Sequence, residues 1–374
     1  MASMPKAGAP SETWIGVLGR GQDGADGIQD YCTHLGKGLA SRGVTLRVSR
    51  VEWRRLGWRR ALAELRRESR AWRGDWVLLQ YTALGFSSRG FPLRAVTVMR
   101  ILRGNGARCA VVFHDPFRQG GRRLRDRLRG TVQEWVIRRI FELSERAIFP
   151  DPLSKIPWLP KQSTKGVCIP IGANIPECPV VANGDAKNEG GLKTVVVFCL
   201  SLDAVMAEEM RDLSVAARTA CEKGARFRLI FLGRGTAEAR EAISAAFLGV
   251  PVEISILGIL DAEKVAEVLS GADIMLCVRG MIYPRRGSAI AGIASGLAVL
   301  GYAGEAEGTP LVEAGVILVP YRDAAALGRE LAKVLGDSAL EAELREKSHR
   351  AYGQYYSWDL IAGAFRRALE GPGA

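Results

Sequence analysis

The stretch Trp14-Ile-Gly-Val-Leu18, followed by Gly19-Arg-Gly-Gln-Asp-Gly24, decides the fold of the first half of the chain. It joins a short apolar run to a glycine-rich turn, and a helical pattern then extends over residues 27–41 and stops at Gly43. A strand, a glycine-rich turn and a helix in this order are typical of the first unit of a parallel α/β sheet. We therefore expect an α/β protein.

The alternation of strands and helices continues and then restarts. Apolar runs that predict strands occupy residues 44–48, 76–80, 109–113, 146–149, 194–199, 227–232, 253–257, 274–278, 298–300 and 316–319. Two doubly wound, Rossmann-like domains that face each other across a cleft are predicted. The expected boundaries are residues 1–175 for the first domain, 176–193 for a linker rich in Pro, Gly and Asn, 194–350 for the second domain, and 351–374 for a C-terminal helix able to pack back on the first.

The composition excludes several classes of protein. The chain has 374 residues, of which 48% are hydrophobic and 25% charged, enough for two globular cores and unlike disordered or collagenous sequences. Its seven cysteines contain no C-x-x-C pair, so neither a disulfide framework nor a thiolate zinc site is indicated. No signal peptide is recognisable at the start, and the longest uncharged stretch, residues 287–304, is too interrupted for a membrane span. We expect a cytoplasmic protein.

The charge is distributed unevenly between the halves. Residues 1–175 contain 31 Lys and Arg against 14 Asp and Glu, a net charge of +17, whereas the remaining residues carry a net charge of −5. A basic half favours an anionic surface or polyanion as its partner, and a near-neutral half favours a small-molecule site.

The first loop satisfies G-x-G-x-x-G through Gly19, Gly21 and Gly24, the pattern of a dinucleotide site. That site also needs an acidic residue about 20 positions later, but the second predicted strand offers Arg47 and Arg50 instead. The loop is therefore interpreted as a backbone-amide loop against a phosphate or sugar, with a plain surface loop and a nicotinamide or flavin site as alternatives.

His114 stands with Asp115 and Pro116 directly after a predicted strand. Loops after strands carry the ligand sites of open parallel sheets, so a role in the cleft is favoured over a purely structural one. No other histidine follows a predicted strand and no carboxylate cluster accompanies it, so no metal site is expected.

Arg285 and Arg286 precede a helix of small residues that begins near Gly287 and Ser288. Either Gly287 or Ser288 could cap this helix, and two guanidinium groups beside a helix N-terminus form a site for a diphosphate. The alternative is a solvated pair of arginines.

Two arginine clusters mark the basic half. They comprise Arg54, Arg55, Arg59, Arg60, Arg66, Arg67, Arg70 and Arg73 in the first, and Arg122, Arg123, Arg125, Arg127 and Arg129 in the second. Such clusters fit a solvated helix face, a membrane-surface patch or a nucleic-acid patch. Trp53, Trp58 and Trp72 lie among the first set and favour the headgroup region of an anionic membrane over nucleic acid.

Several short motifs, in this order and spacing, resemble those of retaining GT-B glycosyltransferases of the family 4 type over nearly the whole chain. They are Asp26-Gly-Ile28, His114-Asp115, Ile169-Pro-Ile-Gly-Ala-Asn174, Leu232-Gly-Arg-Gly235, Leu257-Gly-Ile-Leu-Asp261, Gly271-Ala-Asp-Ile-Met275, Ile293-Ala-Ser-Gly-Leu-Ala-Val299 and Tyr356-Ser-Trp358.

The chain also departs from that family. Tyr283 and Ala291 occupy the places of two glutamates eight residues apart, and the family's Gly-Arg and Lys after the first strand of the second domain are missing around residues 199–202. Glu208 and Glu209 occur where a basic residue would be expected.

The resemblance implies transfer of a sugar from a nucleotide diphosphate sugar to an acceptor, with retention of configuration and without a metal or other cofactor. It places the base and ribose near Gly233, Arg234, Gly235 and Gly258, with UDP favoured over GDP. Arg285, Arg286, Gly287 and Ser288 would hold the diphosphate, Gly27 would close over it, and His114 would touch the sugar. A lipid-linked or membrane-proximal acceptor would suit the basic first domain. A non-catalytic scaffold of the same fold and a dinucleotide-dependent oxidoreductase are the alternatives.

Overall fold

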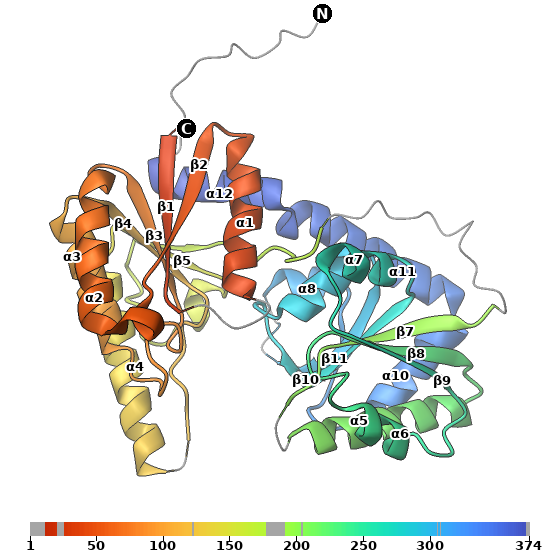
Figure 1. Ribbon diagram of the computed structural model, residues 1–374. Coiled ribbons are helices and arrows are strands. Elements are labelled where there is room, and N and C mark those ends of the chain that lie inside the picture. Colours follow the sequence, from red (N-terminus) through yellow and green to blue (C-terminus); the bar gives the residue numbers. More distant parts are fainter. Residues whose placement is uncertain are drawn as a thin grey trace, which may run out of the picture. The chain divides into compact units, whose positions relative to one another are not determined.

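The computed structural model describes residues 12–20, 26–121, 123–176, 191–202, 205–304, 306 and 308–371. The chain forms two compact units, one of Met1–Pro170 with Trp358–Ala374 and one of Ile171–Ser357 (Figure 1). Most of the predicted linker, residues 177–190, lies outside the described residues.

The first unit is built on a parallel sheet of six strands in the order β2-β1-β3-β4-β5-β6. The strands are β1 (Glu12–Leu18), β2 (Val44–Arg50), β3 (Trp76–Tyr81), β4 (Arg108–Phe113), β5 (Arg146–Phe149) and β6 (Gly166–Cys168). All six residues of β3 are buried, as expected for a strand covered on both faces.

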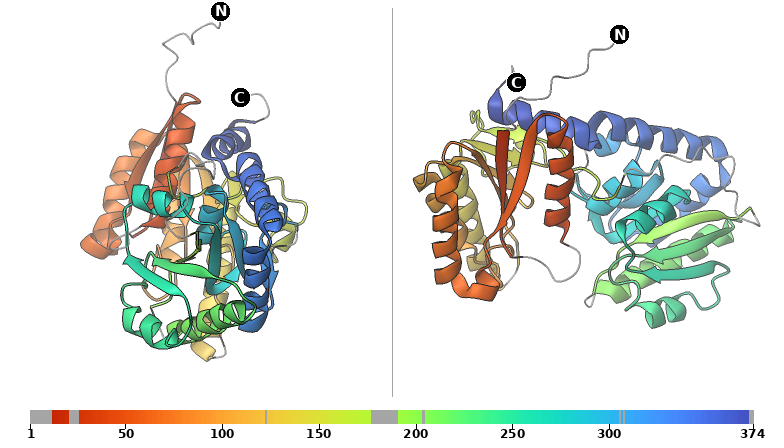
Figure 2. Two further views of the ribbon diagram at one scale, coloured as in Figure 1. Left: turned by 90° about the vertical axis from the view of Figure 1, so that its right-hand side faces the viewer. Right: turned by 45° about the horizontal axis from the view of Figure 1, so that its top comes forward.

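Helices cover both faces of this sheet. They are α1 (Gly27–Ala40), α2 (Trp53–Glu68), η1 (Ser69–Trp72), α3 (Leu93–Gly104), α4 (Leu124–Leu143), η2 (Leu153–Lys155) and α12 (Trp358–Glu370). A single apolar core joins α2, α3 and α4 to one face. On the other side α12 packs along α1 (Figure 2). There Arg42 pairs with Asp359 at 2.5 Å, and the ring of Trp358 lies against Tyr31.

The second unit repeats the plan with a parallel sheet in the order β12-β11-β10-β7-β8-β9. Its strands are β7 (Lys193–Phe198), β8 (Phe227–Leu232), β9 (Glu253–Gly258), β10 (Ile274–Ile282), β11 (Ala298–Ala303) and β12 (Ile317–Val319). The helices are α5 (Val205–Glu222), α6 (Arg240–Ala246), α7 (Ala262–Ser270), α8 (Gly287–Ala294), α9 (Pro310–Glu313), α10 (Ala324–Gly336) and α11 (Ser338–Ala351), followed by the π-helix η3 (Tyr352–Tyr356).

Two apolar clusters lie on opposite faces of the second sheet. One joins α5, α6 and α10 to the sheet, and the other joins α7, α8, α9 and α11 to it. Each unit is therefore a doubly wound, Rossmann-like domain, as the sequence predicts. In such domains the carboxyl ends of the strands carry the ligand site, so a ligand is expected at the loops after β7, β8 and β10 or at those after β1, β3 and β4.

Candidate functional site

The loop after β7 in the second unit turns sharply against the loop after β8. Cys199 has a left-handed φ of 64°, and a Cβ at Gly233 would lie 2.8 Å from its sulfur. A Cβ at Gly235 would lie 2.6 Å from the carbonyl oxygen of Leu200. Gly233 and Gly235 also have positive φ, so glycine is required at both for this close backbone approach.

Gly258 holds the next strand end to the same loop. The N–H of Gly233 donates to the carbonyl oxygen of Gly258 at 2.7 Å, and Gly258 has a φ of 70°. The three glycines that the sequence assigns to the nucleotide therefore share one structural task, which is to draw the ends of β7, β8 and β9 together.

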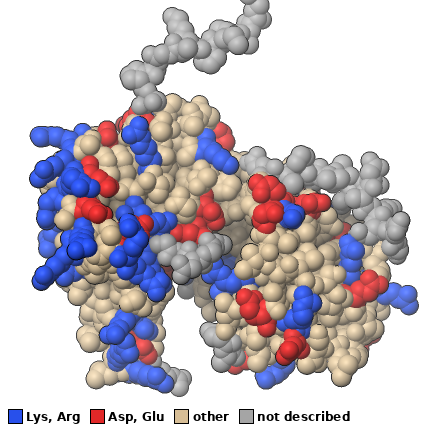
Figure 3. All heavy atoms as spheres, in the orientation of Figure 1, with Lys and Arg blue, Asp and Glu red and all other residues tan. Residues whose placement is uncertain are grey.

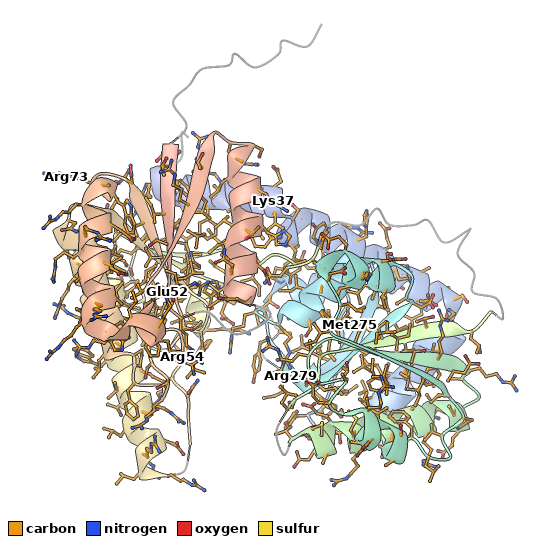
Figure 4. All side chains as sticks on the ribbon, viewed as in Figure 1. Lys37, Glu52, Arg54, Arg73, Met275 and Arg279 are labelled. Carbon is orange, nitrogen blue, oxygen red and sulfur yellow. The ribbon has the colours of Figure 1, made fainter. Side chains whose placement is uncertain are left out.

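Three guanidinium groups from separate segments act on the thiol of Cys199. Burial raises the pKa of Cys199, and the positive charges of Arg279, Arg234 and Arg286 oppose this rise. Arg279 lies within β10, at the place where the register against β11 shifts between Cys277 and Met281. This irregularity leaves Arg279 exposed, and Figure 4 shows it beyond Met275 on the same strand.

Arg286 is half-buried, whereas Arg279 is exposed. Burial lowers the pKa of Arg286, and the like charge of Arg279 lowers it further. A Cβ at Gly280 would lie 3.6 Å from Nη2 of Arg286, which places this guanidinium beside the end of β10. Two like charges held together in a partly buried place form a site that an anion would stabilise.

Glu209 is the buried acid of this region. Its side chain is fully buried on α5, and its two oxygens accept hydrogen bonds from the N–H of Ser201 at 2.8 Å and the hydroxyl of Ser201 at 2.6 Å. Its charge favours the charged form of Arg286. Its neighbour Glu208 instead pairs with Arg322 at 2.5 Å. Glu209 thus fixes the turn after β7 rather than facing a substrate as a base.

The turn before α8 places the predicted diphosphate residues around a tight hydrogen bond. The N–H of Arg286 donates to the carbonyl oxygen of Tyr283 at 2.8 Å, and the guanidinium of Arg285 lies 5.0 Å from the centre of the Tyr283 ring. The helix begins at Gly287, so the prediction that Gly287 or Ser288 caps it is wrong: Arg286 holds the N-cap position and makes no side-chain cap.

Ser288 lies in the first turn of α8 and is hydrogen-bonded to Cys277. Burial raises the pKa of the Cys277 thiol to about 11, while Arg286 and the bond to Ser288 act against this rise. The hydroxyl of Ser288 therefore already has a hydrogen-bond partner within the fold. The backbone N–H of Ser288, and not its hydroxyl, is best placed to bind a ligand.

In the first unit, His114 is held by β3 and α1. Its Nε2 lies 2.8 Å from Oε1 of the buried Gln80, and its ring meets Tyr31 edge-on at 4.9 Å. An amide oxygen only accepts, so Nε2 carries the proton. Burial lowers the pKa of His114 to about 4, although the charge of Asp26 opposes this. His114 is thus neutral near pH 7.

The glycine-rich loop of the first unit is described only at its ends, because Gly21 and Gly24 lie outside the described residues. At its start, a Cβ on Gly19 would lie 2.2 Å from the carbonyl oxygen of Gly85. At its other end, Gly27 is the first residue of α1, and Asp26 caps that helix by accepting from the N–H groups of residues 28 and 29.

Arg50, at the end of β2, is bound to this loop. Its Nη2 lies 3.0 Å from Oδ2 of Asp26 and its Nη1 donates to the carbonyl oxygen of Gly19 at 3.3 Å. A small hollow opens beside this pair, lined also by Arg20, Gln80 and Thr82. The place where a dinucleotide site needs an acidic residue is therefore filled by a cation that is already paired.

The arginines of α2 and η1 are exposed, whereas the tryptophans among them turn all or part of their surface inward. Trp53 is buried and donates from Nε1 to the carbonyl oxygen of Gly85 at 2.8 Å, and Trp58 stacks on it at 5.1 Å. Trp72 packs against the same core. The expectation that these tryptophans anchor the protein in headgroups is wrong for Trp53, which is buried. Trp58 and Trp72 are half-buried, and for them the expectation stays a prediction. Figure 3 shows the basic side chains gathered over the first unit.

No group of three or more His, Cys, Asp or Glu side chains within the described part of the chain is arranged to hold a metal ion. No helix among the described residues is long and apolar enough to cross a membrane.

No protein-family model matches this sequence, and no curated protein matches it. Similar solved structures exist. A glycosyltransferase from Rickettsia africae ESF-5 superimposes with a TM-score of 0.68 at 13% identity, covering 97% of this chain and 100% of that one. Sucrose-phosphate synthase from Thermosynechococcus elongatus superimposes with a TM-score of 0.63 at 16% identity, covering 96% of this chain and 99% of that one. HepE from Anabaena, solved with UDP and glucose, superimposes with a TM-score of 0.64 at 12% identity, covering 96% of this chain and 99% of that one. With its two six-stranded parallel sheets, each covered by helices on both faces, the chain has the GT-B fold.

Proposed function

We propose that this protein is a glycosyltransferase that moves a sugar from a nucleotide diphosphate sugar to an acceptor with retention of configuration and without a metal ion. The observation that carries the proposal is the gathering of arginines at the end of β7. The N–H of Leu200, just after β7, donates to the carbonyl oxygen of Arg234 at 2.9 Å, and Nη2 of Arg286 lies 3.6 Å from the place of a Cβ at Gly280, the residue after Arg279. This gathering occurs at the carboxyl edge of a doubly wound sheet, where such folds bind ligands. HepE, which has been solved with UDP and glucose, shares this fold.

The chemistry needs positive charge at the leaving group. As the bond between sugar and diphosphate breaks, negative charge develops on the diphosphate, and preorganised cations at that position lower the barrier. Arg286 is already partly desolvated and repelled by Arg279, so an incoming diphosphate removes an unfavourable interaction as well as adding hydrogen bonds. Guanidinium groups can supply the charge that a metal ion supplies elsewhere.

The other site residues are assigned to the remaining parts of the donor. The base and ribose would lie near Gly233, Arg234, Gly235 and Gly258, with UDP favoured over GDP, and the diphosphate would meet Arg285, Arg286 and the backbone at Gly287 and Ser288. Gly27 would close over the phosphates. His114 would touch the donor sugar as a neutral imidazole, its ring fixed by Gln80.

The acceptor is proposed to be a lipid-linked or membrane-proximal glycan, reached by a cytoplasmic protein that binds the inner face of the membrane without spanning it. The basic first unit supports this, since its exposed arginines favour an anionic surface. The second candidate is a scaffold of the same fold without activity. It is favoured by Tyr283 and Ala291, which leave the turn before α8 and the helix itself without the two glutamates.

Calorimetry on the full chain separates these readings. We expect UDP to bind more tightly than uridine, UDP-sugars to bind, and NAD to give no heat. Incubation with a bound UDP-sugar should slowly release UDP by hydrolysis even without an acceptor. Binding without any release would favour the scaffold, and binding of NAD but not of UDP would contradict the proposed donor.

A further inference from the structure

Helix α4 exposes an apolar stripe that no part of the described chain covers. Leu124 is 84% exposed, Leu128 58% and Trp135 50%. Their spacing of four and seven residues places all three on one face of the helix. Figure 1 shows the N-terminal half of α4 extending past the other helices of the first unit.

The opposite face of α4 already satisfies its packing. It buries Gly130, Gln133, Val136, Ile137, Ile140 and Phe141 in the core of the first unit. Gln133 is also hydrogen-bonded, since its amide donates to the carbonyl oxygen of Gly90 at 2.9 Å. The exposed leucines and tryptophan are therefore additional to what folding requires, and exposed apolar side chains that share one helix face mark an interaction surface.

Arginines flank the stripe. Arg123, Arg125 and Arg127 are exposed, and none of them makes an ion pair with a described residue. Further along, Arg138 and Arg139 pair with acids of the same helix, Glu134 and Glu142. The unpaired positive charge thus gathers around the protruding half of the helix, beside Leu124 and Leu128.

We propose that this face of α4 docks on an anionic lipid bilayer. Leu124, Leu128 and Trp135 would enter the boundary between headgroups and acyl chains, and the arginines beside them would meet lipid phosphates, as in helices that lie in the interface plane. The proposal refines the membrane contact in the proposed function. In this proposal α4 supplies the apolar anchor, and the exposed arginines of α2 contribute only long-range electrostatic attraction to the anionic bilayer.

Two other partners fit these residues less well. A nucleic acid would use the arginines but would leave two exposed leucines in water. A second copy of the chain, related by a two-fold axis, would bring the same unpaired arginines against each other. An anionic bilayer offers phosphates and an apolar layer together, which matches both parts of the surface.

The test is flotation of the full chain with vesicles of phosphatidylglycerol and phosphatidylcholine at low salt, with phosphatidylcholine vesicles for comparison. We expect binding to the anionic vesicles only. Leu124→Glu with Leu128→Glu should weaken the partition at least tenfold. The matched control is Leu248→Glu with Val312→Glu, which changes apolar side chains of the second unit that are 83% and 58% exposed. This control should bind vesicles as the wild type does.

Trp135 gives a second readout. Anionic vesicles should shift the tryptophan emission of the wild type to shorter wavelength, and Trp135→Phe should abolish most of the shift while retaining most of the binding.

Three results would overturn the proposal: equal vesicle binding by the leucine variant and its control, binding of RNA or DNA in the absence of vesicle binding, or a dimer in sedimentation that the leucine variant abolishes. UDP calorimetry on the same proteins separates this from the proposed function. All variants should bind UDP equally, and a wild type that binds vesicles but not UDP would refute the donor assignment alone.

Discussion

Arg286 is the side chain from which a diphosphate should gain most. Arg286→Ala and Arg285→Ala should each weaken UDP binding by about 1.5–3 kcal/mol, the usual contribution of a hydrogen bond to a charged group. The binding of uridine, which has no phosphate, should not change. Calorimetry measures both, with Arg218→Ala on the exposed side of α5 as the matched control. Equal losses for uridine and UDP would show that these arginines only support the fold.

His114 should matter for turnover rather than for nucleotide affinity. In the proposed function it touches the donor sugar, whereas the nucleotide is assigned to residues of the second unit. His114→Ala should therefore lower the rate of UDP release from a UDP-sugar by roughly two orders of magnitude, the range typical of a positioned acid–base or polar group, with nearly unchanged affinity for UDP. Turnover within twofold of the wild type would return His114 to a structural role.

The protonation of His114 also predicts a pH effect on stability. Burial lowers the pKa of His114 from its ordinary 6.5 to about 4, so the unfolded chain binds more protons between these values. The stabilisation from a neutral His114 is complete above pH 6.5 and is lost as the pH falls toward 4. In urea denaturation at pH 7.5 and pH 5, the wild type should lose more stability than His114→Gln, which cannot titrate. An equal loss would mean that the imidazole titrates normally.

Residues also show where sequence interpretation reaches its limit. The strand ending near Val278 was predictable because buried parallel strands form continuous apolar runs. Arg279 was not, because a charged residue after such a run reads as the start of a loop, whereas β10 continues through an irregularity to Ile282. Trp53 misled for a related reason: its place among arginines suggests an interfacial anchor, whereas its ring is buried and its Nε1 donates to the carbonyl oxygen of Gly85.

At the scale of elements, the packing of α12 on α1 depends on a glycine. A Cβ on Gly38 would lie 2.7 Å from the carbonyl oxygen of Trp358 and 3.0 Å from Cβ of Ala362, so the two helices would have to separate. Gly36, on the same helix, has only ordinary contacts, the nearest at 3.5 Å to Leu46. Gly38→Ala should cost about 1–3 kcal/mol, the usual penalty of overpacking.

Gly36→Ala is the matched control for this prediction. It replaces a helical glycine by a better helix former without a clash, so it should be neutral or stabilise by up to about 1 kcal/mol. Urea denaturation of both variants measures the difference. If Gly38→Ala were as stable as Gly36→Ala, the close approach of α1 and α12 would not be rigid.

The elements themselves were largely predictable, but their arrangement was not. Alternating apolar strands and helices identified eleven strand regions that the structure confirms. The three-residue strand β6 is too short to produce a pattern, and the strand orders within the sheets depend on contacts between distant residues, which a single sequence does not reveal. The glycines at 233, 235 and 258 were found as a motif, yet their positive φ angles, with the close contacts at Gly233 and Gly235, explain them without a ligand.

At the scale of the whole molecule, the proposed function divides the work between the units, and the nucleotide should belong to the second alone. Residues 171–357 are one continuous segment with apolar clusters on both faces of its sheet. The segment contains Arg234, Arg279 and Arg286 together with Glu209, the acid that fixes the turn beside them. We expect the isolated segment to fold and to retain weak affinity for UDP, because the contacts assigned to base, ribose and diphosphate are all present.

Calorimetry of this segment against UDP and uridine checks the division, once circular dichroism and a cooperative thermal transition show that it is folded. Its affinity should be lower than that of the full chain, because Gly27 and the rest of the first unit are missing. Arg286→Ala within the segment should reduce UDP binding by the same factor as in the full chain, since no partner of Arg286 has been removed. A folded segment that binds no UDP, together with a first unit that does, would reverse the assignment of donor and acceptor sides.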